Sequence, residues 1–192
     1  MALILLRHTR PLGADGLCYG RTDLPPGPDL ANAARRLDAR LPAVTAILTS
    51  PLVRCLRLAE ALGAARGLKA AVDDRLAELD FGSWEGVRWD RVARAELDLW
   101  AADLTGARPH GGETVAEMAA RVAAALAEAP EGALVVTHMG PIRAALAAAG
   151  RAGAWEARLA FGAWIELPRP PRPPQGGFSG RRDAEDPRPP SR

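Results

Sequence analysis

The chain has 192 residues, of which 48% are hydrophobic, and a formal net charge of +2 at pH 7. This length suits one well-buried domain and leaves little room for a second full domain, so we expect one. The charge is unevenly placed, because residues 168–192 hold six Arg and three acidic residues, a balance of +3 that leaves −1 for residues 1–167. The main part of the chain is therefore not a basic nucleic-acid-binding domain.

The two cysteines, Cys18 and Cys55, lie in different kinds of segment without metal-ligand spacing, so neither a disulfide framework nor a zinc site is indicated. The apolar stretch at the amino terminus ends at Arg7, too early for a signal-peptide core, and no run approaches the ~20 apolar residues of a membrane span. We therefore expect a soluble, cytoplasmic protein with no membrane or nucleic-acid partner. A homodimer is compatible with the sequence, which does not determine the oligomeric state.

Short apolar runs alternate with helical patterns along the chain. The expected strands cover residues 2–7, 46–49, 70–73, 132–137 and 163–167, and the expected helices cover residues 30–40, 53–66, 114–128 and 141–149. Continuous apolar runs are typical of strands buried on both faces, and alternating strands and helices favour a mainly parallel sheet. We predict an α/β three-layer sandwich, with helices on both faces of the sheet.

Two segments depart from this alternation. Residues 80–112 are rich in tryptophan and charge, and we expect an insertion folded over one end of the sheet, with Trp89 and Trp100 in a core and His110 in a solvated loop. Residues 168–192 are rich in Pro, Arg and Gly and cannot bury enough apolar surface to offset their ordering entropy. We predict one domain over residues 1–167 and a disordered tail over residues 168–192.

Two of the expected strands end at a histidine. The first leads into Arg7-His8, and a later one leads into His138, which Gly140-Pro141 follows at the start of a helix. The carboxyl ends of strands in an α/β sheet meet in the crevice where such folds bind ligands. A neutral imidazole can act as a nucleophile beside a guanidinium that holds an anionic substrate, which indicates a site at this edge.

A serine and a proline follow the second expected strand. Ser50 is placed as the N-cap and Pro51 as the first helical residue, so Arg54 lies in the first helical turn. The free N–H groups of a helix start favour anions, and an arginine beside them strengthens a phosphate site. Arg57 is the competing arginine at this helix start.

Three carboxylates, Glu78, Asp80 and Glu85, lie beside aromatic residues in the segment 78–86. A carboxyl group desolvated by such neighbours can have its pKa raised enough to act as a general acid. Spacing alone does not choose among the three.

Together these residues resemble the histidine phosphatase superfamily, also called the phosphoglycerate mutase-like family. The resemblance covers residues 1–167 and rests on Arg7-His8-Thr9, Ser50-Pro51-Leu52-Val53-Arg54, Glu78-Leu79-Asp80-Phe81-Gly82-Ser83-Trp84-Glu85-Gly86, Gly111-Gly112-Glu113-Thr114 and Thr137-His138-Met139-Gly140. Several ordered motifs make a chance agreement improbable.

The resemblance implies that His8 is a nucleophile that becomes a phosphohistidine and that Glu78 is the proton donor. It implies that Arg7, Arg54 and His138 bind the phosphoryl oxygens, and that no metal or cofactor is needed. The physical chemistry agrees, because cationic and N–H donors can stabilise the charge on a transferring phosphoryl group. A carboxyl group can protonate the leaving alkoxide and then accept a proton from water.

Thr9 stands where the family usually has glycine, and Arg10-Pro11-Leu12 offers no clear counterpart of the usual downstream Asn. The Thr9 hydroxyl could donate to phosphate, or the side chain could crowd the pocket. Because the charged set is complete, we expect a working pocket with Thr9 among its substrate-binding residues.

The segment Cys18-Tyr19-Gly20-Arg21-Thr22-Asp23-Leu24-Pro25 resembles a loop of alpha-ribazole phosphatases, which act in cobalamin biosynthesis. This resemblance implies a phosphatase of small phosphorylated metabolites, with alpha-ribazole 5′-phosphate as the first substrate and Arg21 and Thr22 as substrate-binding residues. The alternatives are a phosphoglycerate mutase, a protein-phosphohistidine phosphatase, and a phosphate-binding module disabled at Thr9.

Overall fold

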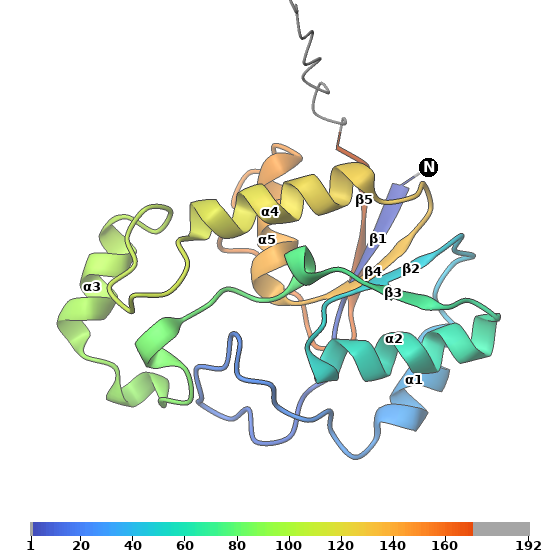
Figure 1. Ribbon diagram of the computed structural model, residues 1–192, viewed down its shortest axis with the longest axis horizontal. Coiled ribbons are helices and arrows are strands. Elements are labelled where there is room, and N and C mark those ends of the chain that lie inside the picture. The colour runs from blue at the N-terminus through green and yellow to red at the C-terminus, as the bar shows by residue number, and fades with distance from the viewer. Residues whose placement is uncertain (1, 171–192) are drawn as a thin grey trace, which may run out of the picture.

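The centre of the protein is one five-stranded sheet, seen in a computed structural model that describes residues 2–170 (Figure 1). The strands are β1 (Ala2–Arg7), β2 (Ile47–Thr49), β3 (Ala70–Val72), β4 (Leu134–Thr137) and β5 (Trp164–Pro168). Their order in the sheet is β3-β2-β4-β1-β5, and only β5 runs antiparallel to its neighbour. The predicted mainly parallel α/β sheet is confirmed.

Helices cover both faces of the sheet and complete the predicted three layers (Figure 1). The helices are α1 (Leu30–Asp38), α2 (Val53–Arg66), α3 (Arg94–Ala102), α4 (Val115–Glu128) and α5 (Met139–Ala148). Leu3 and Leu5 of β1 pack with α4 and α5, whereas Ile4 and Leu6 pack with α1 and α2. Successive strand side chains point to opposite faces, so a strand between two helical layers must be apolar throughout.

The register of β1 and β4 brings the two strand-end histidines to the same edge. Arg7 lies opposite Thr137 in the parallel ladder, and the backbone N–H of His8 donates to the Thr137 carbonyl at 3.0 Å. His8 and His138 are the next residues of these two strands. Their rings lie 5.0 Å apart between centroids, as the sequence predicted from the strand ends alone.

The start of α2 differs from the prediction. The helix begins at Val53 with Leu52 as its N-cap, so Ser50 is not the cap. The carboxylate of Asp23 accepts the backbone N–H of Val53 at 2.7 Å and takes that role. This cap comes from a loop 30 residues earlier, where local sequence could not show it. Helix α5 likewise begins at Met139, before the expected Pro141, with His138 as its N-cap.

The insertion at residues 80–112 folds as short helical turns and α3, a helix that the sequence analysis did not predict. His110 is only 2% exposed, so the expectation of a solvated loop histidine was wrong. Its ring packs against Trp84 and Phe81, with centroids 4.9 and 5.7 Å away. The aromatic residues of this segment therefore form a small core of their own, and the His110 ring packs within it.

The globular part extends slightly beyond the predicted boundary at residue 167. Pro168 is the last residue of β5 and pairs with Ala2, and an Nη1 hydrogen of Arg169 is donated to the Ala129 carbonyl at 3.3 Å. The remainder of the predicted tail, residues 171–192, lies outside the described residues. Within residues 2–170, the helices lack the length and hydropathy needed to cross a membrane.

Candidate active site

The imidazole of His8 has its tautomer set by the backbone. Its Nδ1 lies 2.7 Å from the Thr9 carbonyl oxygen. Because a carbonyl only accepts, Nδ1 carries the hydrogen and Nε2 keeps a lone pair. His8 is 2% exposed, and burial together with the Arg54 guanidinium lowers the pKa of His8 to about 3. A neutral imidazole with a free Nε2 is the form that can attack an electrophile.

Arg7 is fixed beside this nucleophile with one donor unused. Its guanidinium carbon lies 3.9 Å from the centroid of the Phe161 ring, and an Nη1 hydrogen is donated to the Leu159 carbonyl. Its buried Nε has no hydrogen-bond partner within residues 2–170. A buried N–H without a partner is costly, so an arginine held in this way is suited to an anionic ligand.

Arg54, rather than Arg57, is the buried arginine of α2. Its Nη groups donate to the carbonyls of Gly20 at 2.7 Å and Thr22 at 2.8 Å, and its buried Nε lacks a partner among the described residues. Arg57 is 59% exposed and pairs with Glu60 at 2.9 Å. Arg54 therefore holds the loop before it in place while keeping one donor free.

His138 is fully buried at the junction of β4 and α5. Its Nε2 lies 2.7 Å from the Ser50 hydroxyl oxygen, and its ring meets the His8 ring at an angle of 64°. Burial, followed by the His8 and Arg54 charges, lowers the pKa of His138 well below its ordinary value. This histidine is therefore also neutral near pH 7, with one N–H to offer.

The structure separates Glu78 from the other two carboxylates. Glu78 lines the same cavity as Arg7 and His8, and its Oε2 accepts the Gly140 N–H at 3.2 Å. A Cβ atom at Gly140 would lie 2.1 Å from the Glu78 Oε1, so a larger residue there would displace the carboxylate from this position. Glu78 is therefore the carboxyl group placed beside the nucleophile.

Asp80 and Glu85 also accept backbone N–H groups, but unlike Glu78 they do not line the cavity. Asp80 accepts the N–H of Gly82 at 2.8 Å, which stabilises a turn. Glu85 accepts the N–H groups of Arg21 and Thr22 at 2.7 and 2.9 Å, and the Thr22 hydroxyl at 2.6 Å. These carboxylates hold the loop and the insertion together, which leaves Glu78 as the candidate general acid.

A cavity of about 160 Å³ opens onto these groups. It is lined by Arg7, His8, Leu17, Tyr19, Gly20, Glu78, Phe81, Trp89 and Met139. Arg54 and His138 lie directly behind this lining, in contact with the Gly20 carbonyl and the His8 ring. We call Arg7, His8, Arg54, Glu78 and His138 the phosphate floor. The other large side chains of the lining are called the aromatic wall, after the aromatic residues among them: Leu17, Tyr19, Phe81, Trp89 and Met139.

The aromatic wall contains a residue that the sequence analysis assigned elsewhere. Trp89 lines the cavity and is 36% exposed, so its expected core position was wrong. Gly20 allows the wall to form, because a Cβ atom there would lie 1.9 Å from the Leu79 carbonyl oxygen. The loop thus packs directly onto the insertion, a contact that no local pattern predicts.

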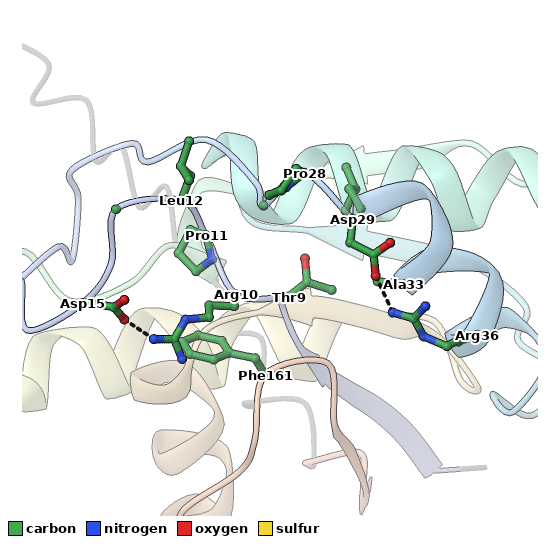
Figure 2. A pocket seen from close by; sticks show the side chains of 13 residues that line it. Thr9, Arg10, Pro11, Leu12, Asp15, Pro28, Asp29, Ala33, Arg36 and Phe161 are labelled. Atoms are coloured by element: carbon green, nitrogen blue, oxygen red, sulfur yellow. Dashed lines mark hydrogen bonds and ion pairs between the residues drawn. The ribbon is translucent and has the colours of Figure 1, made fainter.

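Thr9 faces a different depression of the surface. It lines a groove of about 470 Å³ together with Phe161 and the start of α1, as Figure 2 shows, and it is not among the residues lining the His8 cavity. Ion pairs between Arg10 and Asp15 and between Arg36 and Asp29 flank this groove (Figure 2). The Thr9 side chain therefore does not crowd the cavity.

The two loop residues predicted to bind substrate have other partners. The hydroxyl of Thr22 donates to Glu85, and an Nη2 nitrogen of Arg21 lies 4.0 Å from a Glu113 carboxylate oxygen. Neither residue lines the His8 cavity. The structure therefore assembles Arg7, His8 and Glu78 around the cavity and places Thr9, Arg21 and Thr22 outside it.

Arg121 holds the Glu78 segment in place and was not predicted from the sequence. Its Nη2 donates to the Glu78 carbonyl at 3.0 Å, and its Nε donates to Glu113 at 2.6 Å. The signal available in the sequence was an arginine next to Val122, a core position of α4. A partly buried arginine in such a place needs several acceptors, and the 75–78 backbone supplies them.

Comparison with known proteins identifies the family of the chain. A family model described as the histidine phosphatase superfamily (branch 1) matches residues 3–164. The chain therefore belongs to the histidine phosphatase superfamily. The crystal structure of phosphoglycerate mutase from Thermus thermophilus is similar, with a TM-score of 0.72 and 32% identity over 90% of this chain and 95% of that one.

Curated relatives extend the comparison to Mycobacterium tuberculosis. The chain is 34% identical over 163 residues to the bifunctional protein Rv2228c, covering 79% of this chain and 44% of that protein. It is 39% identical over 106 residues to glucosyl-3-phosphoglycerate phosphatase, covering 52% of this chain and 46% of that protein. The chain thus spans less than half the length of these relatives.

Proposed function

We propose that the protein is a phosphomonoester hydrolase that forms a phosphohistidine on His8. The observation that carries this proposal is the buried, neutral His8, whose Nδ1–H is held by the Thr9 carbonyl while Nε2 is free in the cavity shared with Glu78. Family membership supports the same chemistry.

The phosphate floor can carry out both halves of such a reaction. Nε2 of His8 attacks phosphorus, the bond to the ester oxygen breaks, and Glu78 gives its proton to the leaving alkoxide. Water then attacks the phosphohistidine, Glu78 takes the proton from that water, and the P–N bond breaks to restore His8. The unpartnered Nε groups of Arg7 and Arg54 stabilise the phosphoryl oxygens, so we expect turnover without a metal ion.

The aromatic wall supports a substrate with an uncharged, aromatic leaving group. Among the described residues that line the cavity, Arg7 is the one cation, and it belongs to the phosphate floor. A phosphoglycerate also carries a carboxylate, which this wall leaves without a cationic partner. An aromatic group can instead stack on Phe81 or Trp89.

Alpha-ribazole 5′-phosphate, which carries a benzimidazole, remains our first proposed substrate, with a role in cobalamin biosynthesis. The relatives named above include no alpha-ribazole phosphatase, and loop residues such as Gly20 and Thr22 serve to build the pocket. The aromatic wall therefore supports this choice more directly than the loop resemblance does. Cytoplasmic location and a homodimer stay predictions.

Phosphoglycerate chemistry is the second candidate, because it is favoured by the similarity to the Thermus mutase and to the mycobacterial phosphatase. A mutase returns the phosphoryl group to a second position of its substrate, whereas a phosphatase releases it to water. Measurement of inorganic phosphate distinguishes these outcomes directly.

The deciding experiment follows phosphate release with a chelator present. The substrates are alpha-ribazole 5′-phosphate, 3-phosphoglycerate, glucosyl-3-phosphoglycerate and an aryl phosphate, and the enzymes are wild type and His8→Ala. We expect release by wild type, highest with an aromatic leaving group, and an acid-labile phosphohistidine that His8→Ala lacks. Interconversion of phosphoglycerates without release would favour the mutase, and absence of both turnover and phosphohistidine would favour a phosphate-binding module.

A further inference from the structure

Ser50 and Cys55 lie beside the ring nitrogens of His138. Its Nε2 lies 2.7 Å from the Ser50 Oγ and 3.4 Å from the Cys55 Sγ. Its Nδ1 has the Cys55 Sγ at 3.7 Å and no oxygen or nitrogen partner within the part of the chain that the structure describes. Both ring nitrogens therefore contact the Cys55 sulfur, but only Nε2 also has an oxygen partner among the described residues.

A buried neutral histidine carries one proton, and its position decides what the ring can do. The ring nitrogen with the proton donates, and the other only accepts. A phosphoryl oxygen needs a donor, so His138 can stabilise it only through the protonated nitrogen. Because the partner of one nitrogen sets the protonation of the other, the contact at Nε2 controls the function of Nδ1.

The Ser50 hydroxyl is placed to donate at this contact. Its Oγ already accepts the N–H of Leu52 at 3.3 Å, which leaves its own hydrogen available. Burial raises the pKa of the Cys55 thiol, so its sulfur stays protonated and is a weak acceptor for that hydrogen. The lone pair of Nε2 is the better acceptor, and this arrangement satisfies both Ser50 and Nε2.

We propose that Ser50 is a positioning residue, whose hydroxyl donates to Nε2 of His138 and thereby keeps the ring proton on Nδ1. His138 then offers an Nδ1–H to a phosphoryl group on His8, whose ring lies 5.0 Å away between centroids. The catalytic part of this inference rests on the proposed function. Ser50 is free for this role because Asp23 caps α2 in its place.

The first test measures the tautomer directly, in the resting protein and without substrate. The chain has three histidines, so ¹⁵N chemical shifts of an untagged, labelled sample can be assigned with single substitutions. We expect Nδ1–H for His138 in wild type and a shift to Nε2–H, which free imidazole prefers, in Ser50→Ala. Cys55→Ala is the matched control and should leave His138 as Nδ1–H, with His8 unchanged in all three proteins.

Two results would overturn the inference: an Nε2–H His138 in wild type, or an Nδ1–H His138 that persists in a folded Ser50→Ala protein. Thermal unfolding checks that each variant is folded. Ser50→Thr retains the hydroxyl and should restore Nδ1–H, which keeps the inference testable should Ser50→Ala be too unstable for spectroscopy.

The second test asks whether the tautomer matters for turnover of an aryl phosphate. Loss of one oriented donor to the phosphoryl group should lower kcat of Ser50→Ala by about 100-fold with a smaller change in KM. Ser50→Thr should recover most of the loss, and Cys55→Ala should behave as wild type. An unchanged kcat in a Ser50→Ala protein with altered tautomer would refute the catalytic role. If wild type itself forms no phosphohistidine, the proposed function fails while the tautomer result still stands.

Discussion

The phosphate floor and the aromatic wall meet at one cavity but have different origins. His8 and His138 follow adjacent strands of the sheet. Close to the same sheet edge, Arg54 is buried and Glu78 accepts the N–H of Gly140 at the start of α5. The aromatic wall comes from the 17–20 loop, the insertion and the start of α5, and Trp89 is partly exposed. The comparison indicates that the sheet determines which reaction is possible and the loops determine which substrate enters.

Removal of the Glu78 carboxyl function should have the largest effect among the tests of this comparison. Glu78→Gln should lower kcat for an alkyl phosphate by about 10²–10⁴-fold, because the leaving alkoxide then departs without a proton. Because Glu78 also accepts a proton from water in the second half-reaction, the general-acid role is read from kcat/KM, which reports only the steps up to phosphohistidine formation. The loss of kcat/KM should be much smaller for 4-nitrophenyl phosphate, whose leaving group is stable as an anion, and equal losses of kcat/KM for the two substrates would argue against a general-acid role.

The two arginines of α2 form a matched pair for the next test. Arg54→Ala should lower kcat/KM by about 10²–10³-fold, because it removes a buried donor to the phosphoryl group. Arg57→Ala should leave activity near that of wild type, since Arg57 is exposed and paired with Glu60. Similar activities of the two variants would contradict the assignment of Arg54 to the phosphate floor.

The buried histidines of the phosphate floor should also make stability depend on pH. The pKa of His8 is about 3 in the folded state, below its value in the unfolded chain. The contribution of His8 to the free energy of unfolding is therefore fully present above pH 6.5 and is lost as the pH falls toward 3. For His8 alone, the unfolding free energy should drop by about 3 kcal/mol between pH 8 and pH 4.5, and His138 acts in the same direction.

Urea unfolding of wild type and His8→Asn over this pH range measures the effect. The variant should lose less stability on acidification than wild type does. Parallel pH profiles for the two proteins would show that His8 is not held neutral by its surroundings.

The aromatic wall should affect selectivity and leave the chemistry intact. Trp89→Ala should lower kcat/KM by about 10-fold for a substrate with an aromatic leaving group, in line with the loss of one stacking contact. A small alkyl phosphate should be affected little. Trp100→Phe is a control within the insertion, since Trp100 does not line the cavity. An equal loss for both substrates would place Trp89 in the catalytic apparatus.

Thr9 should show the smallest effect. Because its side chain faces the groove of Figure 2 and not the His8 cavity, Thr9→Gly should change kcat by less than about threefold, a difference below 1 kcal/mol in the activation barrier. The Thr9 carbonyl that fixes the His8 tautomer is retained in the variant. A large gain or loss of activity would show that the hydroxyl does reach the substrate.

The phosphate floor was largely predictable because its residues follow local patterns. A buried strand that ends in histidine can be recognised from adjacent residues, and so can an arginine at a helix start. Spacing alone did not choose among the three carboxylates, and only the family resemblance pointed to Glu78, because the choice depends on which carboxylate approaches Gly140 and which ones bind the 21–22 backbone. Trp89 and His110 were misplaced for the same reason: the insertion has no periodic pattern that shows its inward side.

By itself, the sequence determined the α/β class, the sheet-edge position of His8 and His138, and the family that its motifs resemble. These features depend on hydrophobic periodicity and short motifs, which act between residues close in the chain. The tertiary structure alone decided that Asp23 caps α2 and that Ser50 contacts His138, and it placed Glu78 in the lining of the His8 cavity. Each of these contacts joins distant segments, and their geometry exists only once the sheet register and the loop packing bring those segments together.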